Sequence, residues 1–387
     1  MATLALPTAD RRLETYTTRP PRAWPTRLAN PFNRTAIAAA HLVADPLAEC
    51  DPWLDAAVDW DATIGYRRHL WRLGLGVAEA MDTAQRGMGL DWKTSLELIR
   101  RSIEAAKSEG GAVVFSGAGT DHLPPGQYAI EAIICAYEEQ IGAIETLGGR
   151  VILMASRALA ASARSPDDYG LVYDRILRQL REPAIIHWLG DMFDPALAGY
   201  WGHKDLDAAT EVALDVIARN AATVEGVKIS LLDKDREIAM RRRLPKTVKM
   251  YSGDDFNFSE LIAGDEQGYS DALLGILDAI APAASAALAA LARGSRNEFH
   301  DMLAPTVPLS RHIFKAPTRF YKTGIVFMAY LNGHQKHFVM VGGQESARSM
   351  LHLAELFRLA DAAGLLVDPD LAARRMSTVL RSHGIDA

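Results

Sequence analysis

Short apolar runs of strand length alternate along the chain with longer amphipathic stretches, and this alternation limits the possible fold more than any other feature. Eight runs have the length and composition of strands, at residues 35–43, 76–83, 111–119, 150–156, 183–190, 224–230, 248–253 and 267–274. Between most of them lie patterns typical of helices, such as 92–109 and 128–149. Because two parallel strands need a crossover of a dozen or more residues, this order predicts parallel pairing and a (β/α)8 TIM barrel.

The last two runs leave a second architecture open. Only a short segment separates 248–253 from 267–274, and the final run has a helix-like tail, so an open doubly wound sheet is the main alternative. Residues 1–34 are rich in Pro, Thr and Arg, which favours an extended N-terminal segment. We therefore expect the barrel to span 35–280, with a helical C-terminal region over 281–387 packed on it.

Charge and cysteine content limit the classes of partner. The formal net charge is -6 and the pI is near 6.0, which gives no general attraction to nucleic acid or anionic lipid. The first residues have too short an apolar run for a secretory signal. Cys50 and Cys135 lack the spacing of a disulfide framework or a zinc site. We expect a cytoplasmic protein, with no cofactor, nucleic acid or membrane as partner.

Polar residues stand at the ends of several predicted strands, where a barrel of this kind has its active-site mouth. The residues that we expect to bind substrate there are Asp82, Thr83, Ser116, Arg157, Ser230, Gly253, Asp254 and Asp255. His187 also lies at a strand end, and a neutral imidazole can move a proton between two substrate atoms. A single histidine in an apolar strand is also typical of a core residue, so both interpretations of His187 stay open.

One lysine lies inside an otherwise apolar strand, in the sequence Val-Glu-Gly-Val-Lys-Ile-Ser at 224–230. Strand alternation puts Lys228 on the face opposite Val227 and Ile229. If the apolar pair faces the helices, the amine points into the barrel, where burial favours its neutral, nucleophilic form. An ion pair with Asp254 or Asp255 is the structural alternative. Lys234, in the following polar loop, would be hydrated and is the weaker candidate.

The order of these motifs resembles the dihydrodipicolinate synthase/N-acetylneuraminate lyase family of class I aldolases over roughly residues 35–360. "GVKIS" resembles the strand that carries the family's Schiff-base lysine, and "MYSGDDFNFSELIAGDEQGYSD" resembles its Gly-Asp-Asp run. "PAIIHWLG" resembles its fifth strand, with His187 where the family has a proton-relaying tyrosine. "DTAQRGMGLDWKTSLELIRRSIEAA" resembles its threonine-rich loop and following helix, with Asp82-Thr83 in place of two threonines.

The resemblance implies a Schiff-base-forming carbon–carbon lyase, aldolase or dehydratase that acts through Lys228 in carbohydrate or keto acid metabolism. It also implies a homo-oligomer, as a dimer or tetramer. Asp82 would repel the carboxylate of a 2-oxo acid unless Arg86 or Arg157 offsets it, which favours a polyhydroxylated keto-sugar.

Two alternatives remain. A metal-dependent lyase or hydrolase would use His122, His187 and an aspartate, although no His-x-His or His-Glu-x-x-His spacing is present. A sugar-binding relative without catalysis would keep only the barrel.

Overall fold

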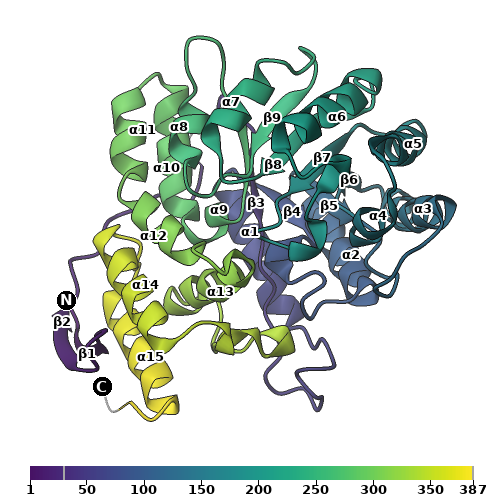
Figure 1. Ribbon diagram of the computed structural model, residues 1–387. Helices are drawn as coiled ribbons and strands as arrows, with labels where there is room; N and C mark the ends of the chain where they lie inside the picture. The colour runs from purple at the N-terminus through teal and green to yellow at the C-terminus, as the bar shows by residue number, and fades with distance from the viewer. Residues whose placement is uncertain (29–30, 386–387) are drawn as a thin grey trace.

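Eight parallel strands close into a barrel, and each of the eight predicted runs contains one of them. The computed structural model describes residues 1–28 and 31–385. The barrel strands are β3 (Ala36–Ala39), β4 (Gly76–Glu79), β5 (Val114–Ala118), β6 (Arg150–Leu153), β7 (Ala184–Leu189), β8 (Val224–Ser230), β9 (Lys249–Ser252) and β10 (Asp271–Leu274). Because β10 pairs with both β9 and β3, the sheet has no open edge (Figure 1). The barrel is therefore confirmed and the open doubly wound sheet is wrong.

Helices surround the barrel, between successive strands and, for the last of them, directly after β10 (Figure 1). They are α1 (Trp60–Arg72), α2 (Trp92–Ser108), α3 (Ile130–Thr146), α4 (Arg157–Ser162), α5 (Pro166–Leu177), α6 (Leu206–Arg219), α7 (Lys234–Arg241), α8 (Phe258–Ala263) and α9 (Ile276–Ala279). Their starts are encoded locally: Asp91, for example, caps α2 by accepting from the backbone N–H of Thr94 at 2.8 Å.

Two apolar clusters distinguish the inside of the barrel from its outside. The interior cluster contains Ile37, Ala39, Ala78, Met81, Phe115, Ile152, Ile185, Tyr251 and Leu273. The alternate strand positions, such as Val77, Val227 and Ile229, belong to the larger cluster beneath the helices. This two-residue period fixes which side chains of each strand can reach the mouth.

The chain after β10 is mainly helical. It forms α10 (Ala281–Ala292), α11 (Arg296–Leu303), α12 (Thr306–Ile313), α13 (Tyr321–Leu331), α14 (Met350–Ala362) and α15 (Pro369–Ser382). All eleven residues of α13 are buried. This helix lies against the end of β4, where the Tyr321 hydroxyl contacts the Thr83 Oγ1 at 2.8 Å. The C-terminal region therefore contributes to the surroundings of the mouth.

The N-terminal segment contains a hairpin that sequence reasoning did not identify. Strands β1 (Thr3–Pro7) and β2 (Leu13–Thr17) pair antiparallel and lie beside α14 and α15 (Figure 1). The Tyr16 hydroxyl donates to Asp361 at 2.7 Å, so α14 holds the hairpin in place. In the described residues, no helix is long and apolar enough to span a membrane.

Candidate active site

Lys228 points into the barrel, as the alternation predicts. Val227 and Ile229 on either side of it pack in the outer cluster. Gly226 faces inward with Lys228, and a Cβ there would lie 2.6 Å from the Tyr251 ring, so this position needs glycine. The Lys228 side chain is almost fully enclosed, with 7% of the residue exposed. Among the described residues, no hydrogen bond and no ion pair within 4.0 Å involves its ammonium.

Burial lowers the pKa of Lys228, because an ammonium is poorly solvated inside the barrel. The negative charges of Asp255 and Asp82 oppose this effect without cancelling it. Burial also raises the pKa of Asp255 to about 7, against the opposing effects of the Ile276 N–H, which donates to its Oδ1 at 2.8 Å, and of the Lys228 charge. An amine and a carboxyl that can each change protonation state therefore share one site.

His187 lies beside Lys228, since the two residues are register partners on β7 and β8. Its neighbour in the same inward-facing row, Ile185, belongs to the interior cluster. The His187 Nε2 lies 3.2 Å from the Ser230 Oγ, and its Nδ1 is buried with no hydrogen-bond partner in the described part of the chain. Burial, and then the Lys228 charge, lower the pKa of His187 well below its usual value, so the ring is neutral near pH 7.

The segment after β4 carries Asp82 and Thr83 on a short 3-10 helix, η1 (Asp82–Ala84). Ala80 and Gln85, on either side of it, have positive φ angles of 53° and 64°, which only a well-braced loop maintains. Gln85 supplies part of that bracing by donating to the Val341 carbonyl at 2.7 Å. The strained loop places Asp82 close enough to Lys228 to affect its pKa.

Sequence reasoning missed two residues that α13 brings to this loop. One is Tyr321, whose hydroxyl contacts Thr83. The other is Lys322, which is 4% exposed and donates to the Arg319 carbonyl at 3.0 Å. Burial lowers the pKa of Lys322 to about 8, opposed by the charges of Asp82 and Asp194. The signal was present: a lysine in the apolar stretch 321–331 meets the same criterion that singled out Lys228.

A cavity of about 610 Å³ opens at the carboxyl end of the barrel, within the usual size range of small-molecule sites. Its polar part includes Asp82, His187, Arg157 and Asp194. The Arg157 Nε lies 2.5 Å from the Asp194 Oδ2, so these two charges are paired. The rest of the wall is largely apolar and includes Leu123, Pro124, Met154, Ala158, Ala161, Leu189 and Leu197.

Several of the expected substrate-binding residues have structural contacts instead. Ser116 lies between Phe115 and Gly117, which face the interior, so its own side chain is on the outer face of the barrel. Asp254 accepts from the backbone N–H groups of Phe256 and Asn257, which closes a turn. The structure therefore does not bring Ser116 to the mouth and gives Asp254 a local role.

Gly253 is needed for close packing, because a Cβ there would lie 2.3 Å from the Ser230 Oγ. Ser230 faces inward and contacts His187.

Arg86, which was considered as a counterion of Asp82, and His122, which was considered as a metal ligand, both have other partners. Arg86 donates to both carboxylate oxygens of Asp121, at 2.8 and 2.7 Å, and to the Gln140 Oε1 at 2.6 Å. The His122 Nδ1 contacts Gln140 at 2.7 Å, and its Nε2 lies 3.4 Å from Glu139. In the part of the chain that the structure describes, no three His, Cys, Asp or Glu side chains are grouped to hold a metal ion.

A family model with the description "Protein of unknown function (DUF993)" matches residues 4–385. The chain belongs to this family. No curated protein sequence matches it significantly.

Solved structures show the fold. Dihydrodipicolinate synthase from Aquifex aeolicus aligns with a TM-score of 0.64 at 13% identity, covering 87% of this chain and 99% of that one. The enzymes from Acinetobacter baumannii, solved in complex with pyruvate, and from Thermotoga maritima both align with a TM-score of 0.64 at 15% identity, covering 86% of this chain and 99% of theirs. The resemblance stated from the sequence is therefore confirmed as a shared fold.

Proposed function

We propose that the protein is a Schiff-base-forming lyase, aldolase or dehydratase that acts on a 2-oxo acid or keto-sugar through Lys228. The observation that carries this proposal is an amine buried inside the barrel, with no carboxylate within 4.0 Å of it among the described residues. A lysine kept only for structure would be expected to form an ion pair, and Asp254 and Asp255 were the expected partners. Neither lies within 4.0 Å of its nitrogen.

The site contains groups for each proton transfer that this chemistry needs. The neutral amine of Lys228 attacks the substrate carbonyl, a C–N bond forms, and the amine proton passes to the former carbonyl oxygen. That oxygen takes a second proton and leaves as water, and the iminium remains. In C–C cleavage, the electron pair of the breaking bond flows into the iminium and leaves an enamine. In dehydration, a base takes a proton from the carbon next to the iminium, that C–H electron pair flows into the iminium, and the enamine then expels the hydroxyl group, which takes a proton and leaves as water. His187 lies beside the amine as a neutral proton carrier, and the Tyr321 hydroxyl and Asp255 are the further candidates.

The charges around Asp82 bear on the substrate. Arg86 and Arg157, the two residues considered as possible counterions of Asp82, are paired with Asp121 and Asp194. Lys322 is a buried cation close enough to Asp82 for the carboxylate to raise its pKa. A substrate carboxylate near Asp82 and Lys322 would therefore be repelled by one charge and attracted by the other. For this reason we propose 2-oxo acids as well as keto-sugars as substrates. The apolar wall leaves fewer positions for hydroxyl groups far from Asp82.

Borohydride trapping tests the proposal. Reduction during incubation with pyruvate or a keto-sugar should leave a stable mass adduct on the peptide that contains Lys228. Lys228→Met should remove both adduct and activity. Lys234→Met is the matched control, because Lys234 is half exposed and paired with Glu260 at 2.6 Å. Activity that a chelator abolishes, without any adduct, would support the metal-dependent alternative. The absence of both adduct and turnover would support the sugar-binding alternative.

The assembly and location stay predictions. Closed symmetric dimers are the commonest assembly of soluble proteins, and we expect a dimer as the minimum unit. Light scattering at micromolar concentration measures this directly, and a monomer would contradict it. Cys50 and Cys135 are exposed and unpaired, in agreement with the expected reducing, cytoplasmic setting.

A further inference from the structure

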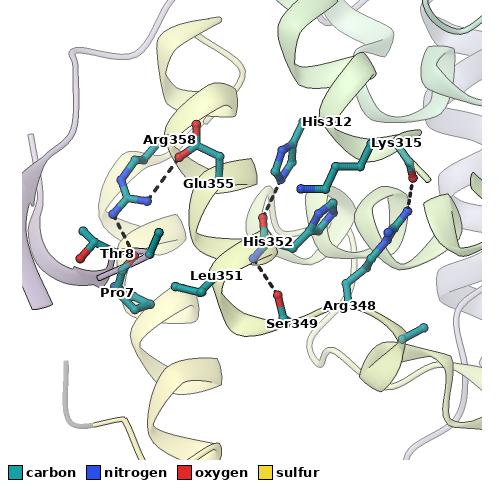
Figure 2. Close-up of a pocket in the computed structure, with 12 residues that line it drawn as sticks. Pro7, Thr8, His312, Lys315, Arg348, Ser349, Leu351, His352, Glu355 and Arg358 are labelled. Atoms are coloured by element: carbon teal, nitrogen blue, oxygen red, sulfur yellow. Dashed lines mark hydrogen bonds and ion pairs between the residues drawn. The ribbon is translucent and has the colours of Figure 1, made fainter. Parts of the chain in front are cut away.

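A second cavity, of about 470 Å³, lies between the N-terminal hairpin and the C-terminal helices. Its wall combines the end of β1, the residues after α12 and the first turns of α14, as Figure 2 shows. It shares no lining residue with the cavity at the barrel mouth. It is large enough for a small organic molecule and not only for a single ion.

The wall has more positive than negative charge. Lys315, Arg348 and Arg358 line it with one carboxylate, Glu355. Glu355 lies 3.4 Å from Arg358, so this pair is close to neutral. Among the described residues, neither Lys315 nor Arg348 has a carboxylate within 4.0 Å. Two cations of the cavity are therefore without a counterion.

Arg348 is the more deeply buried of the two, with 8% of the residue exposed. Its guanidinium donates to the Lys315 carbonyl at 2.7 Å and to the Pro317 carbonyl at 3.1 Å, and its Nε is buried with no hydrogen-bond partner among the residues that the structure describes. Carbonyl groups satisfy its donors in part but do not neutralise its charge. Burying an uncompensated cation is unfavourable, and a bound anion would reduce that cost.

Two histidines in the wall are affected by the positive charges of Lys315 and Arg348. The rings of His312 and His352 are stacked with their centroids 4.1 Å apart, close to Lys315 and Arg348 in Figure 2. Burial and the charges of Lys315 and Arg348 lower the pKa of both rings, that of His352 to about 3. Within residues 1–28 and 31–385, both ring nitrogens of His352 are buried without a hydrogen-bond partner. The wall therefore contains polar groups for which the described residues supply no hydrogen bond.

The start of α14 adds to the field. Ser349 caps the helix by accepting from the His352 N–H at 3.2 Å, and the first turn contains no acidic residue. The partial positive charge of a helix N-terminus is thus not offset from within the helix.

From these observations we propose that the cavity binds a small organic oxyanion. Its carboxylate or phosphate group would lie between Lys315, Arg348 and the first turn of α14, and the rest of the molecule would occupy the space toward β1. Nothing in the chemistry proposed for the barrel mouth uses this site.

Calorimetric titration of the full chain at fixed ionic strength tests the proposal, with inorganic phosphate and citrate as probes and chloride as the reference anion. We expect saturable binding of phosphate or citrate at one site, and the tighter probe identifies the preferred group. Lys315→Glu should weaken this binding roughly tenfold or more, the effect of losing one charge-assisted contact. Lys315 is exposed, so folding should be preserved.

The matched control is Lys246→Glu, at another exposed lysine that does not line this cavity, and it should leave the affinity unchanged. Three results would overturn the proposal: no saturable binding of either probe at millimolar concentration, equal binding by Lys315→Glu and the native protein, or binding that Lys228→Met abolishes and Lys315→Glu does not. The last would place the anion at the barrel mouth.

Discussion

His187 and Lys228 stand opposite each other on neighbouring strands of the barrel, with both side chains turned inward. Burial, and then the charge of Lys228, disfavour the charged form of His187 and lower its pKa. The imidazole is thereby kept neutral near pH 7, and a neutral ring can accept a proton from a carbinolamine or donate one to it. The proposed nucleophile and the proposed proton carrier therefore lie on neighbouring strands.

Replacing His187 should slow the reaction while leaving the nucleophile in place. We expect His187→Gln to lower kcat by about 10²–10⁴-fold, the usual contribution of a positioned acid–base group. The borohydride adduct on Lys228 should still form on longer incubation. Ser230→Ala is the control, since it removes the contact to the His187 Nε2 but keeps the ring, and its effect should be much smaller. A native kcat in His187→Gln would assign this histidine to the core.

Tyr321 should matter for turnover more than for folding. Tyr321→Phe removes the hydroxyl that contacts Thr83 but keeps the ring stacked on Phe314, with centroids 4.4 Å apart. We expect a loss of about 1 kcal/mol in unfolding free energy, as for one hydrogen bond, and a larger proportional fall in kcat. Tyr330→Phe, on the same helix, is the matched control and should leave kcat unchanged. Urea unfolding and steady-state rates give the two values, and equal effects on kcat from both variants would contradict the role of Tyr321.

The strand period is what made Lys228 predictable from the sequence. Its apolar neighbours Val227 and Ile229 fix the face on which it lies, and the structure agrees. The same period applied to β5 would have excluded Ser116, whose neighbour Phe115 belongs to the interior. To predict that a residue lies in the site, its position at a strand end is therefore insufficient, and the face of the strand on which it lies must also be considered.

Contacts between distant parts of the chain were beyond a sequence argument. Thr83 and Tyr321 are 238 residues apart in the sequence, and only the packing of α13 against the barrel brings them together. The hairpin of β1 and β2 likewise depends on a surface that α14 and α15 provide, to which Tyr16 binds through Asp361. Local periodicity predicts elements and faces, whereas such partners depend on how the elements pack.

A buried carboxyl outside the site should affect stability through pH. Burial raises the pKa of Glu237 from 4.5 to about 8, and the Ser252 hydroxyl donates to its Oε2 at 3.0 Å. Between these two values the folded protein holds a proton that the unfolded chain has lost, so this group's contribution to stability falls as pH rises from about 4.5 to 8. Glu237→Gln mimics the protonated form and should lack this loss.

Thermal unfolding across pH measures the effect. The Tm of Glu237→Gln relative to the native protein should increase from pH 5 to pH 8. Glu211→Gln is the control, because Arg243 lowers the pKa of this exposed carboxyl below its ordinary value of 4.5, so its Tm difference should stay nearly constant from pH 5 to pH 8. A Tm difference for Glu237→Gln that stays constant with pH would contradict the assignment.

Asp82 should control both the reactivity of the lysine and the choice of substrate. Its carboxylate raises the pKa of Lys228 and of Lys322 against the effect of burial. Asp82→Asn should therefore lower the pKa of Lys228, and the rate of adduct formation should begin to rise at a lower pH than in the native protein.

Asp82→Asn should also trap pyruvate faster relative to the neutral dihydroxyacetone. Two like charges about 4 Å apart repel by roughly 1 kcal/mol in water and by more in a partly dry site, which corresponds to a factor of about five or more. Asp194→Asn is the control, since Asp194 is not among the charges that act on Lys228, and it should leave the pH dependence in place. Equal trapping of pyruvate by Asp82→Asn and the native protein would mean that Lys322 already neutralises Asp82, and the preference for keto-sugars over 2-oxo acids would then have no basis in charge.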